Sequence, residues 1–178
     1  MWPAELIARV ERLLLSPAAE WDSIDNEGAN VPHIYQSYIL PLVGIAALAR
    51  FLGMAFTGVF LVGWAVKWVV VSAGAVYVVA LIINALAPQF GAKQDFGQAF
   101  KLAAYAPTAS WVGTMFLILP MLWFMALIGA VYSLYLLFVG LPKLMKPAAD
   151  KAMMYSLAVI GCTIVVGVVA FAIIARVG

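Results

Sequence analysis

The chain is built from long apolar runs separated by short polar stretches. A transmembrane helix needs ~20 predominantly apolar residues. We therefore predict an all-α polytopic membrane protein with five spanning helices, at about 35–55, 64–87, 101–119, 121–141 and 152–175. The third run is barely long enough to cross a membrane. It contains Pro107, which frees a backbone carbonyl that nearby hydroxyls or water must satisfy.

The first 33 residues follow a different pattern and are predicted to form an amphipathic segment ahead of a membrane domain at 34–178. Residues 2–15 have helical periodicity. One face carries Leu6, Ile7, Val10, Leu13 and Leu14, and the opposite face mostly carries Glu5, Arg9, Glu11 and Arg12. Ser16-Pro17 is typical of the start of a second, short helix. Two alternatives stay open: this segment lies on the membrane surface, or it docks against the ends of the protein's own helices.

The polar stretches set the expected orientation. Gly140 and Pro142 are predicted to break the fourth run before a short lysine-rich turn, and Asp95 is predicted to begin an interfacial helix. Short loops rich in Lys and Arg are retained in the cytoplasm. Five helices with a cytoplasmic amino end and an outside carboxyl end place ten basic residues unequally: inside are Arg9, Arg12, Lys93, Lys101, Lys143, Lys146 and Lys151, and outside are Arg50, Lys67 and Arg176.

Composition excludes several classes of protein. The chain is 66% hydrophobic and 10% charged, whereas soluble domains are about 45–50% apolar and about 25% charged, so its solvent must be lipid. A net charge of +2 is too small to indicate a nucleic-acid partner. The single cysteine, Cys162, allows no intramolecular disulfide.

The charged residues also argue against an enzyme. None of the eight acids lies in a predicted span: Glu5, Glu11, Glu20, Asp22, Asp25, Glu27, Asp95 and Asp150. Proton-coupled pumps usually rely on intramembrane carboxylates or histidines, and His33 is the only histidine. A serine nucleophile would have no positioned base. We predict a non-enzymatic protein with no cofactor and no metal.

Three groups of residues are candidates for function. The first is a basic inner rim that would hold anionic lipid headgroups: Lys93, Lys101, Lys143, Lys146 and Lys151. The second is an outer anion or headgroup site made by Arg50 and Lys67, or simply two side chains that reach the interface separately. The third is a polar bundle interior: Tyr77, Asn84, Tyr105, Pro107, Thr108, Ser110, Tyr132 and Tyr135. These polar groups either join helices or line a path.

Four segments carry a resemblance to a known family. They are LLLSPAAEWDSI (13–24), YQSYILPL (35–42), LAPQFGAKQDFGQAFKLAAYAPTASW (86–111) and YSLYLLFVGLPKLMKPAADKAMMY (132–155). Together they resemble the bacterial branch of the Yip-domain, or Rab/Ypt-interacting, membrane proteins. The resemblance implies a five-helix domain in the bacterial inner membrane with a cytoplasmic amino end.

The resemblance does not supply a partner. Eukaryotic members are linked to small Rab-type GTPases, but this chain lacks their long polar amino-terminal region and bacteria have no Rab system. A GTPase partner is therefore not carried over, and a homo-oligomer stays open. Two functions remain: a membrane-organising or adaptor protein, and a small channel or transporter for an ion or solute.

Overall fold

A computed structural model describes residues 3–55 and 62–176 of the chain. Within these residues, four helical segments are long and apolar enough to cross a membrane: Val31–Met54, Gly63–Phe90, Pro120–Met145 and Ala152–Ala175. The prediction of an all-helical membrane protein is confirmed to this extent. The expected connection at 56–63 falls largely outside the described residues.

The first of these segments is not one regular helix. It begins with α3 (Val31–Ile34), passes through a π-helical turn at Tyr35–Ile39 and continues as α4 (Leu40–Ala55). Pro41 has no N–H to donate to the carbonyl four residues earlier. The π-helical turn lies immediately before this proline, where the regular hydrogen-bond ladder is interrupted.

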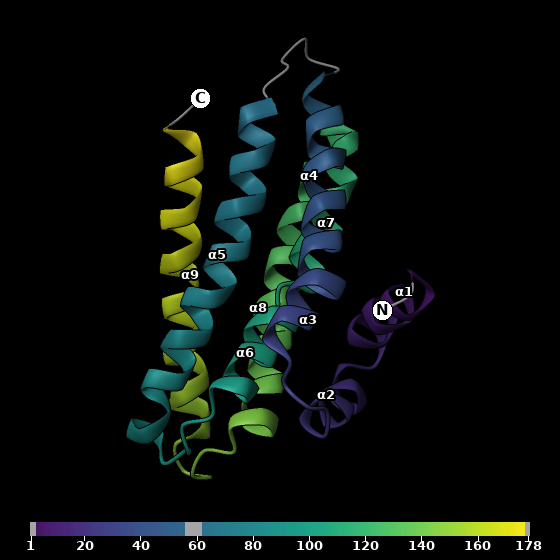
Figure 1. Ribbon diagram of the computed structural model, residues 1–178. Coiled ribbons are helices and arrows are strands. Elements are labelled where there is room, and N and C mark those ends of the chain that lie inside the picture. Colours follow the sequence, from purple (N-terminus) through teal and green to yellow (C-terminus); the bar gives the residue numbers. More distant parts are fainter. Residues whose placement is uncertain (1–2, 56–61, 177–178) are drawn as a thin grey trace.

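The third predicted span is broken, so the prediction of one continuous helix over 101–119 is wrong. The chain forms α6 (Phe96–Tyr105), bends at Ala106 and Pro107, and continues as α7 (Thr108–Met115). Asp95 caps α6 as predicted, accepting a hydrogen bond from the Gln98 N–H at 3.0 Å. The segment still runs through the bundle, because α6 packs on α5 (Val62–Leu86) and α8 (Trp123–Met145), and α7 packs on α4 and α8 (Figure 1). Five spans therefore stay a prediction.

The predicted break at Gly140 and Pro142 is also wrong. Helix α8 continues through both residues to Met145 and ends where Lys146 adopts a left-handed backbone, with φ of 46°. Gly140 serves packing instead, since a Cβ there would lie 2.6 Å from the Trp21 ring. The last helix, α9 (Ala152–Ala175), has the predicted bounds.

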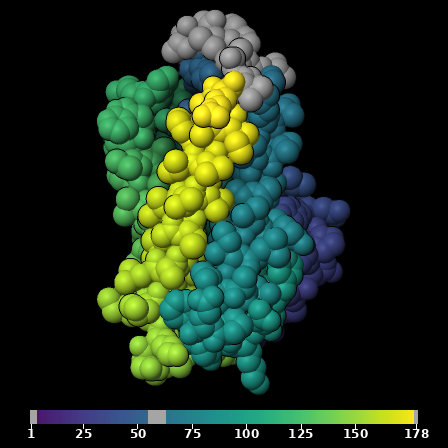
Figure 2. All heavy atoms as spheres, turned by 90° about the vertical axis from the view of Figure 1, so that its left-hand side faces the viewer, coloured from purple at the N-terminus to yellow at the C-terminus, as the bar shows by residue number. Residues whose placement is uncertain are grey.

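Two glycines allow close contact between α7 and α8. Gly113 of α7 and Gly129 of α8 let the two backbones touch, and a Cβ on either would lie 3.2 Å from the other's Cα. At Gly161 and Gly167 of α9 a Cβ would meet nothing within 4 Å. Figure 2 shows why, because α9 forms an outer face of the molecule beside α5. About half of its side chains are exposed, and few are buried.

The amino-terminal segment forms two helices that dock on the side of the bundle. Helix α1 (Pro3–Leu15) packs on α2 (Pro17–Asp25) and on α7, and α2 packs on α8. Leu13, Trp21 and Ile24 are completely buried there. Figure 1 shows α1 and α2 beside the lower part of the bundle, while the carboxyl end lies at the opposite end.

Candidate functional site

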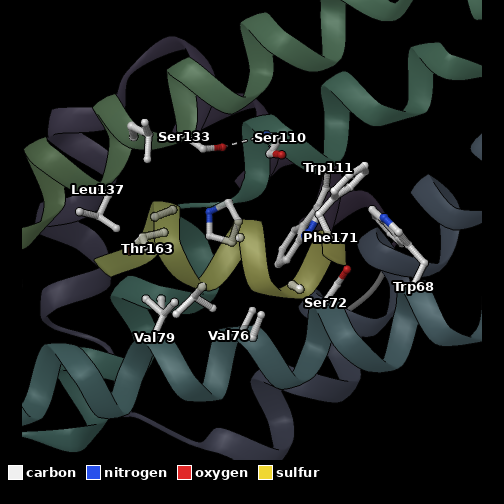
Figure 3. A pocket seen from close by; sticks show the side chains of 18 of the residues that line it. Trp68, Ser72, Val76, Val79, Ser110, Trp111, Ser133, Leu137, Thr163 and Phe171 are labelled. Atoms are coloured by element: carbon white, nitrogen blue, oxygen red, sulfur yellow. Dashed lines mark hydrogen bonds between the residues drawn. The ribbon is translucent and has the colours of Figure 1, made fainter. Parts of the chain in front are cut away.

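A cavity of about 270 Å³ lies beside the break between α6 and α7 (Figure 3). Four parts of the bundle line it: α5, the α6–α7 segment, α8 and α9. On α5 the lining runs from Trp68 to Val79, and on α9 from Thr163 to Ile174. Each stretch rises eleven residues, or roughly 16 Å along a helix axis. The cavity is therefore elongated along the bundle.

Each of these four parts contributes one hydroxyl side chain to the lining: Ser72, Ser110, Ser133 and Thr163. The backbone N–H of Ser110 donates a 2.8 Å hydrogen bond to Oγ of Ser133 (Figure 3). The Thr163 hydroxyl donates to the carbonyl of Val159, also at 2.8 Å. The remaining lining is mostly aliphatic and aromatic, with Trp111 and Phe171 facing the space.

Sequence reasoning found part of this lining and missed the rest. The predicted residues Pro107 and Ser110 line the cavity, but Trp68, Ser72 and Thr163 were not predicted from the sequence. The available signal was a hydroxyl within each long apolar run, as in the "VVVSAGAV" stretch of α5. Which runs face one another could not be read from one sequence.

Two other predicted interior residues, Tyr105 and Thr108, do not line the cavity and instead contact Tyr38 of the π-helical turn. The rings of Tyr38 and Tyr105 pack edge to face with centroids 4.6 Å apart. The hydroxyls of Tyr38 and Thr108 are 2.7 Å apart, and the Thr108 hydroxyl donates to the Tyr105 carbonyl at 2.6 Å. Thr108 thus satisfies the Tyr105 carbonyl at the break between α6 and α7.

The last four interior candidates do not line the cavity. The Tyr132 hydroxyl donates to the Leu14 carbonyl at 2.7 Å, and Tyr135 packs beside Tyr132 with 48% exposure. Tyr77 is 44% exposed and lies against Phe96. Oδ1 of Asn84 is buried without a hydrogen-bond partner.

A buried ionic cluster joins α1 and α2 to the bundle. Arg9 lies 3.1 Å from Glu20 and 2.7 Å from Glu27, and Arg12 lies 2.6 Å from Glu20. The Arg9 guanidinium also sits 5.5 Å from the centre of the Tyr105 ring. Burial acts to lower the pKa of Arg9, but the hydrogen bond with Glu27 and the surrounding charges outweigh burial, so the pKa lies above its ordinary value.

The sequence placed Arg9 on the polar face of α1, and the structure corrects this. Only 11% of its side chain is exposed. Arg9 follows Leu6 by three residues and precedes Leu13 by four, so it lies in the apolar stripe of the helix. That spacing was the signal that sequence reasoning missed.

Three of the five predicted rim lysines hold α2 rather than facing outward freely. Lys101 is 2% exposed, which corrects its expected place on a headgroup-binding rim, and its ammonium donates to the carbonyls of Ile24 and Glu27 at 2.7 Å. Lys143 pairs with Asp22 and donates to Ala18. Lys146 pairs with Asp25 at 2.8 Å. Cations at the carboxyl end of α2 are favoured by the helix dipole.

The other basic candidates lie apart from this cluster. Lys93 and Lys151 are exposed. The guanidinium of Arg50 lies 4.9 Å from the Trp64 ring and so links α4 to α5. Lys67 lies one turn further along α5, and a shared anion site with Arg50 stays a prediction.

Comparison with known proteins agrees with this architecture of packed membrane helices. The model of the Yip1 domain matches residues 12–171. The chain therefore belongs to the Yip1 domain family. It is also similar to the inner membrane protein YohC from Escherichia coli strain K12 and from Escherichia coli O6:H1. Each is 23% identical over 169 residues, covering 84% of this chain and 85% of the relative.

The family match and the long apolar helices support a multi-pass membrane protein, and both of these relatives are inner membrane proteins. No solved structure matches the chain. Within the part of the chain that the structure describes, no group of three or more His, Cys, Asp or Glu side chains could hold a metal ion.

Proposed function

We propose that the protein is a non-enzymatic organiser of the inner membrane that uses α1 as a wedge in the cytoplasmic leaflet. The observation that carries this is the 2.7 Å hydrogen bond from the Tyr132 hydroxyl to the Leu14 carbonyl. It fixes the end of α1 against the middle of a membrane helix rather than beyond the helix ends.

The height of this contact follows from the residue count. Tyr132 precedes Leu141, where the apolar run of α8 gives way to Pro142 and Lys143, by nine residues. At ~1.5 Å per residue this is roughly 14 Å along the axis. The hydrocarbon core is about 30 Å thick, so one leaflet contributes roughly 15 Å of it. In the proposed orientation Leu14 therefore lies deep in the cytoplasmic leaflet.

Part of the surface of α1 suits such a position, while the exposed Glu11 has to point toward the headgroups. Ile7 is 63% exposed and Leu15 is 74% exposed, so apolar side chains remain for lipid after docking. Arg9 and Arg12 are neutralised by the acids Glu20 and Glu27. An amphipathic helix that occupies only one leaflet binds in a way that depends on curvature and lipid composition.

The proposed orientation has the amino end and the Lys143–Lys151 turn in the cytoplasm and the carboxyl end outside. The unequal distribution of basic residues supports it. Lys93 and Lys151 are exposed at the end of the bundle that holds this turn, and they are the residues of the predicted rim best suited to anionic headgroups. Each such charge near an anionic surface is worth about 1 kcal/mol.

Curvature sorting tests the organising function. The purified protein is reconstituted into giant vesicles, and thin tubes are drawn from them. We expect enrichment of the wild-type protein on the tubes when the cytoplasmic side faces outward, and weaker enrichment of the Ile7→Ser, Leu15→Ser double variant. A matched control is Val70→Ser, Val165→Ser, which changes two exposed valines of α5 and α9. Uniform distribution of the wild type, or an equal loss in the control, would contradict the proposal.

A second function is favoured by the cavity at the α6–α7 break. A broken helix beside a cavity with hydroxyls is a feature of membrane transporters, where irregular backbone is tolerated along a cavity. Flux of solutes in liposomes that contain only this protein distinguishes the two functions. Flux that stops when the cavity is filled would favour a channel or transporter over the organiser.

A further inference from the structure

We infer that the cavity at the α6–α7 break binds a single hydrocarbon chain of a neutral membrane amphiphile, with its hydrogen-bonding group held by the serine hydroxyls. Three observations carry this: the shape of the cavity, the chemistry of its lining, and its position behind α9. It does not rest on the wedge proposed for α1.

The shape fits a chain better than a compact solute. The lining extends roughly 16 Å along the helix axes, as the eleven-residue stretches of α5 and α9 require, yet the volume is about 270 Å³. A cavity of ~150 Å³ lined by apolar side chains already stays dry and accepts benzene. The larger and longer space here suits an extended apolar chain.

The lining specifies a neutral ligand with one polar group. None of the described residues that line the cavity is charged, so a carboxylate or phosphate would have no counter-ion. The hydroxyls of Ser110 and Ser133 can still donate hydrogen bonds to a ligand. The bond between these two residues runs from the Ser110 backbone N–H to Oγ of Ser133, so it uses neither hydroxyl hydrogen. The Ser72 hydroxyl points into the space from α5 (Figure 3). A pure hydrocarbon would leave these groups unpaired.

The position gives the ligand a route from the bilayer. Tyr155 and Val159 are buried near one end of α9 and Ile174 near the other, whereas the residues between them are exposed or half-buried. Gly167 lines the cavity, and a Cβ on it would meet nothing within 4 Å. The middle of α9 is thus loosely packed and faces lipid, so a chain can enter beside it.

Photolabelling in nanodiscs tests the inference, with octadecanol carrying a diazirine at mid-chain as the probe. We expect saturable labelling of cavity-lining residues on α5 and α9, displaced by unlabelled octadecanol more effectively than by octadecane. Gly167→Leu should abolish this labelling by filling the space. Gly161→Leu is the matched control, because a Cβ there is equally free of contacts but the residue does not line the cavity.

A second variant separates the polar group from the chain. Ser72→Ala should weaken octadecanol binding roughly two- to tenfold, the net worth of one hydrogen bond, and leave octadecane binding unchanged. Labelling that is not saturable, that falls evenly on lipid-facing residues such as Val70 and Val165, or that survives Gly167→Leu would overturn the inference.

Discussion

The Tyr132 hydroxyl donates its hydrogen bond to the carbonyl of Leu14, 118 residues earlier in the chain. This contact joins the end of α1 to the middle of α8. The contact also gives the Tyr132 hydroxyl, which lies within a long apolar helix, a hydrogen-bond partner. In the proposed wedge, the same hydrogen bond sets the depth of α1 in the bilayer.

Removal of this hydrogen bond should loosen α1 without unfolding the bundle. We expect Tyr132→Phe to lower stability by about 0.6 kcal/mol, the average for such bonds in membrane proteins, and to speed hydrogen exchange in α1. Tyr135→Phe is the control, since Tyr135 is 48% exposed and lies one turn away. Equal exchange in both variants would show that the Tyr132 bond does not hold α1.

The buried cluster of Arg9 and Glu20 should matter far more to stability. Arg9→Ala leaves Glu20, whose side chain is 4% exposed, with only the half-exposed Arg12 as an ionic partner. Breaking a buried pair so that one charge has no partner costs about 3–5 kcal/mol, and because Arg12 still binds Glu20 we expect a loss below this range. Arg12→Ala should cost much less, because 52% of the Arg12 side chain is exposed. Unfolding of the purified protein in denaturing detergent measures both, and similar midpoints for the two variants would contradict the ranking.

Lys101 should hold the carboxyl end of α2 against the bundle. Lys101→Met removes the ammonium that binds the carbonyls of Ile24 and Glu27 at 2.7 Å. We expect limited proteolysis to cut within residues 16–30 of this variant, while Lys93→Met, at an exposed site, remains protected. Cleavage at the same rate in wild type and Lys101→Met would rule out this role of Lys101.

The glycine contact between α7 and α8 should tolerate no side chain. Gly129→Ala places a Cβ against the Ala109 backbone, which cannot move without separating the helices. We expect a clear loss of thermal stability. Gly74→Ala, where a Cβ meets nothing within 4 Å, should be neutral or stabilising by up to about 1 kcal/mol. A neutral Gly129→Ala would mean that α7 and α8 can shift apart freely.

Much of the architecture was predictable from the apolar runs, because lipid imposes length and hydropathy on every span. The bounds of α9 and the cap at Asp95 followed from residues alone. Breaks were harder to place. Pro107 interrupts the third run, whereas Pro142 lies within a helix that continues to Met145, and Gly140 beside it makes room for Trp21.

The candidate site was less predictable, for a reason seen in the basic residues. The sequence predicted a basic inner rim because three lysines fall on or beside predicted inner loops: Lys101, Lys143 and Lys146. Their partners Asp22, Asp25 and the carbonyls of α2 lie more than 70 residues away in the chain. A charge pattern along the sequence predicts the side of the membrane, but it does not predict which residues a lysine contacts in the folded protein.

The depth of α1 in the bilayer tests the wedge most directly. In a Cys162→Ala background, single spin labels are placed at Ile7→Cys and Leu15→Cys, with Lys93→Cys as an aqueous reference and Val165→Cys as a lipid-facing reference. The account predicts that labels at 7 and 15 in liposomes collide with oxygen and are protected from a water-soluble nickel reagent, as at 165. Accessibility to nickel equal to that at 93 would place α1 in water and contradict the account.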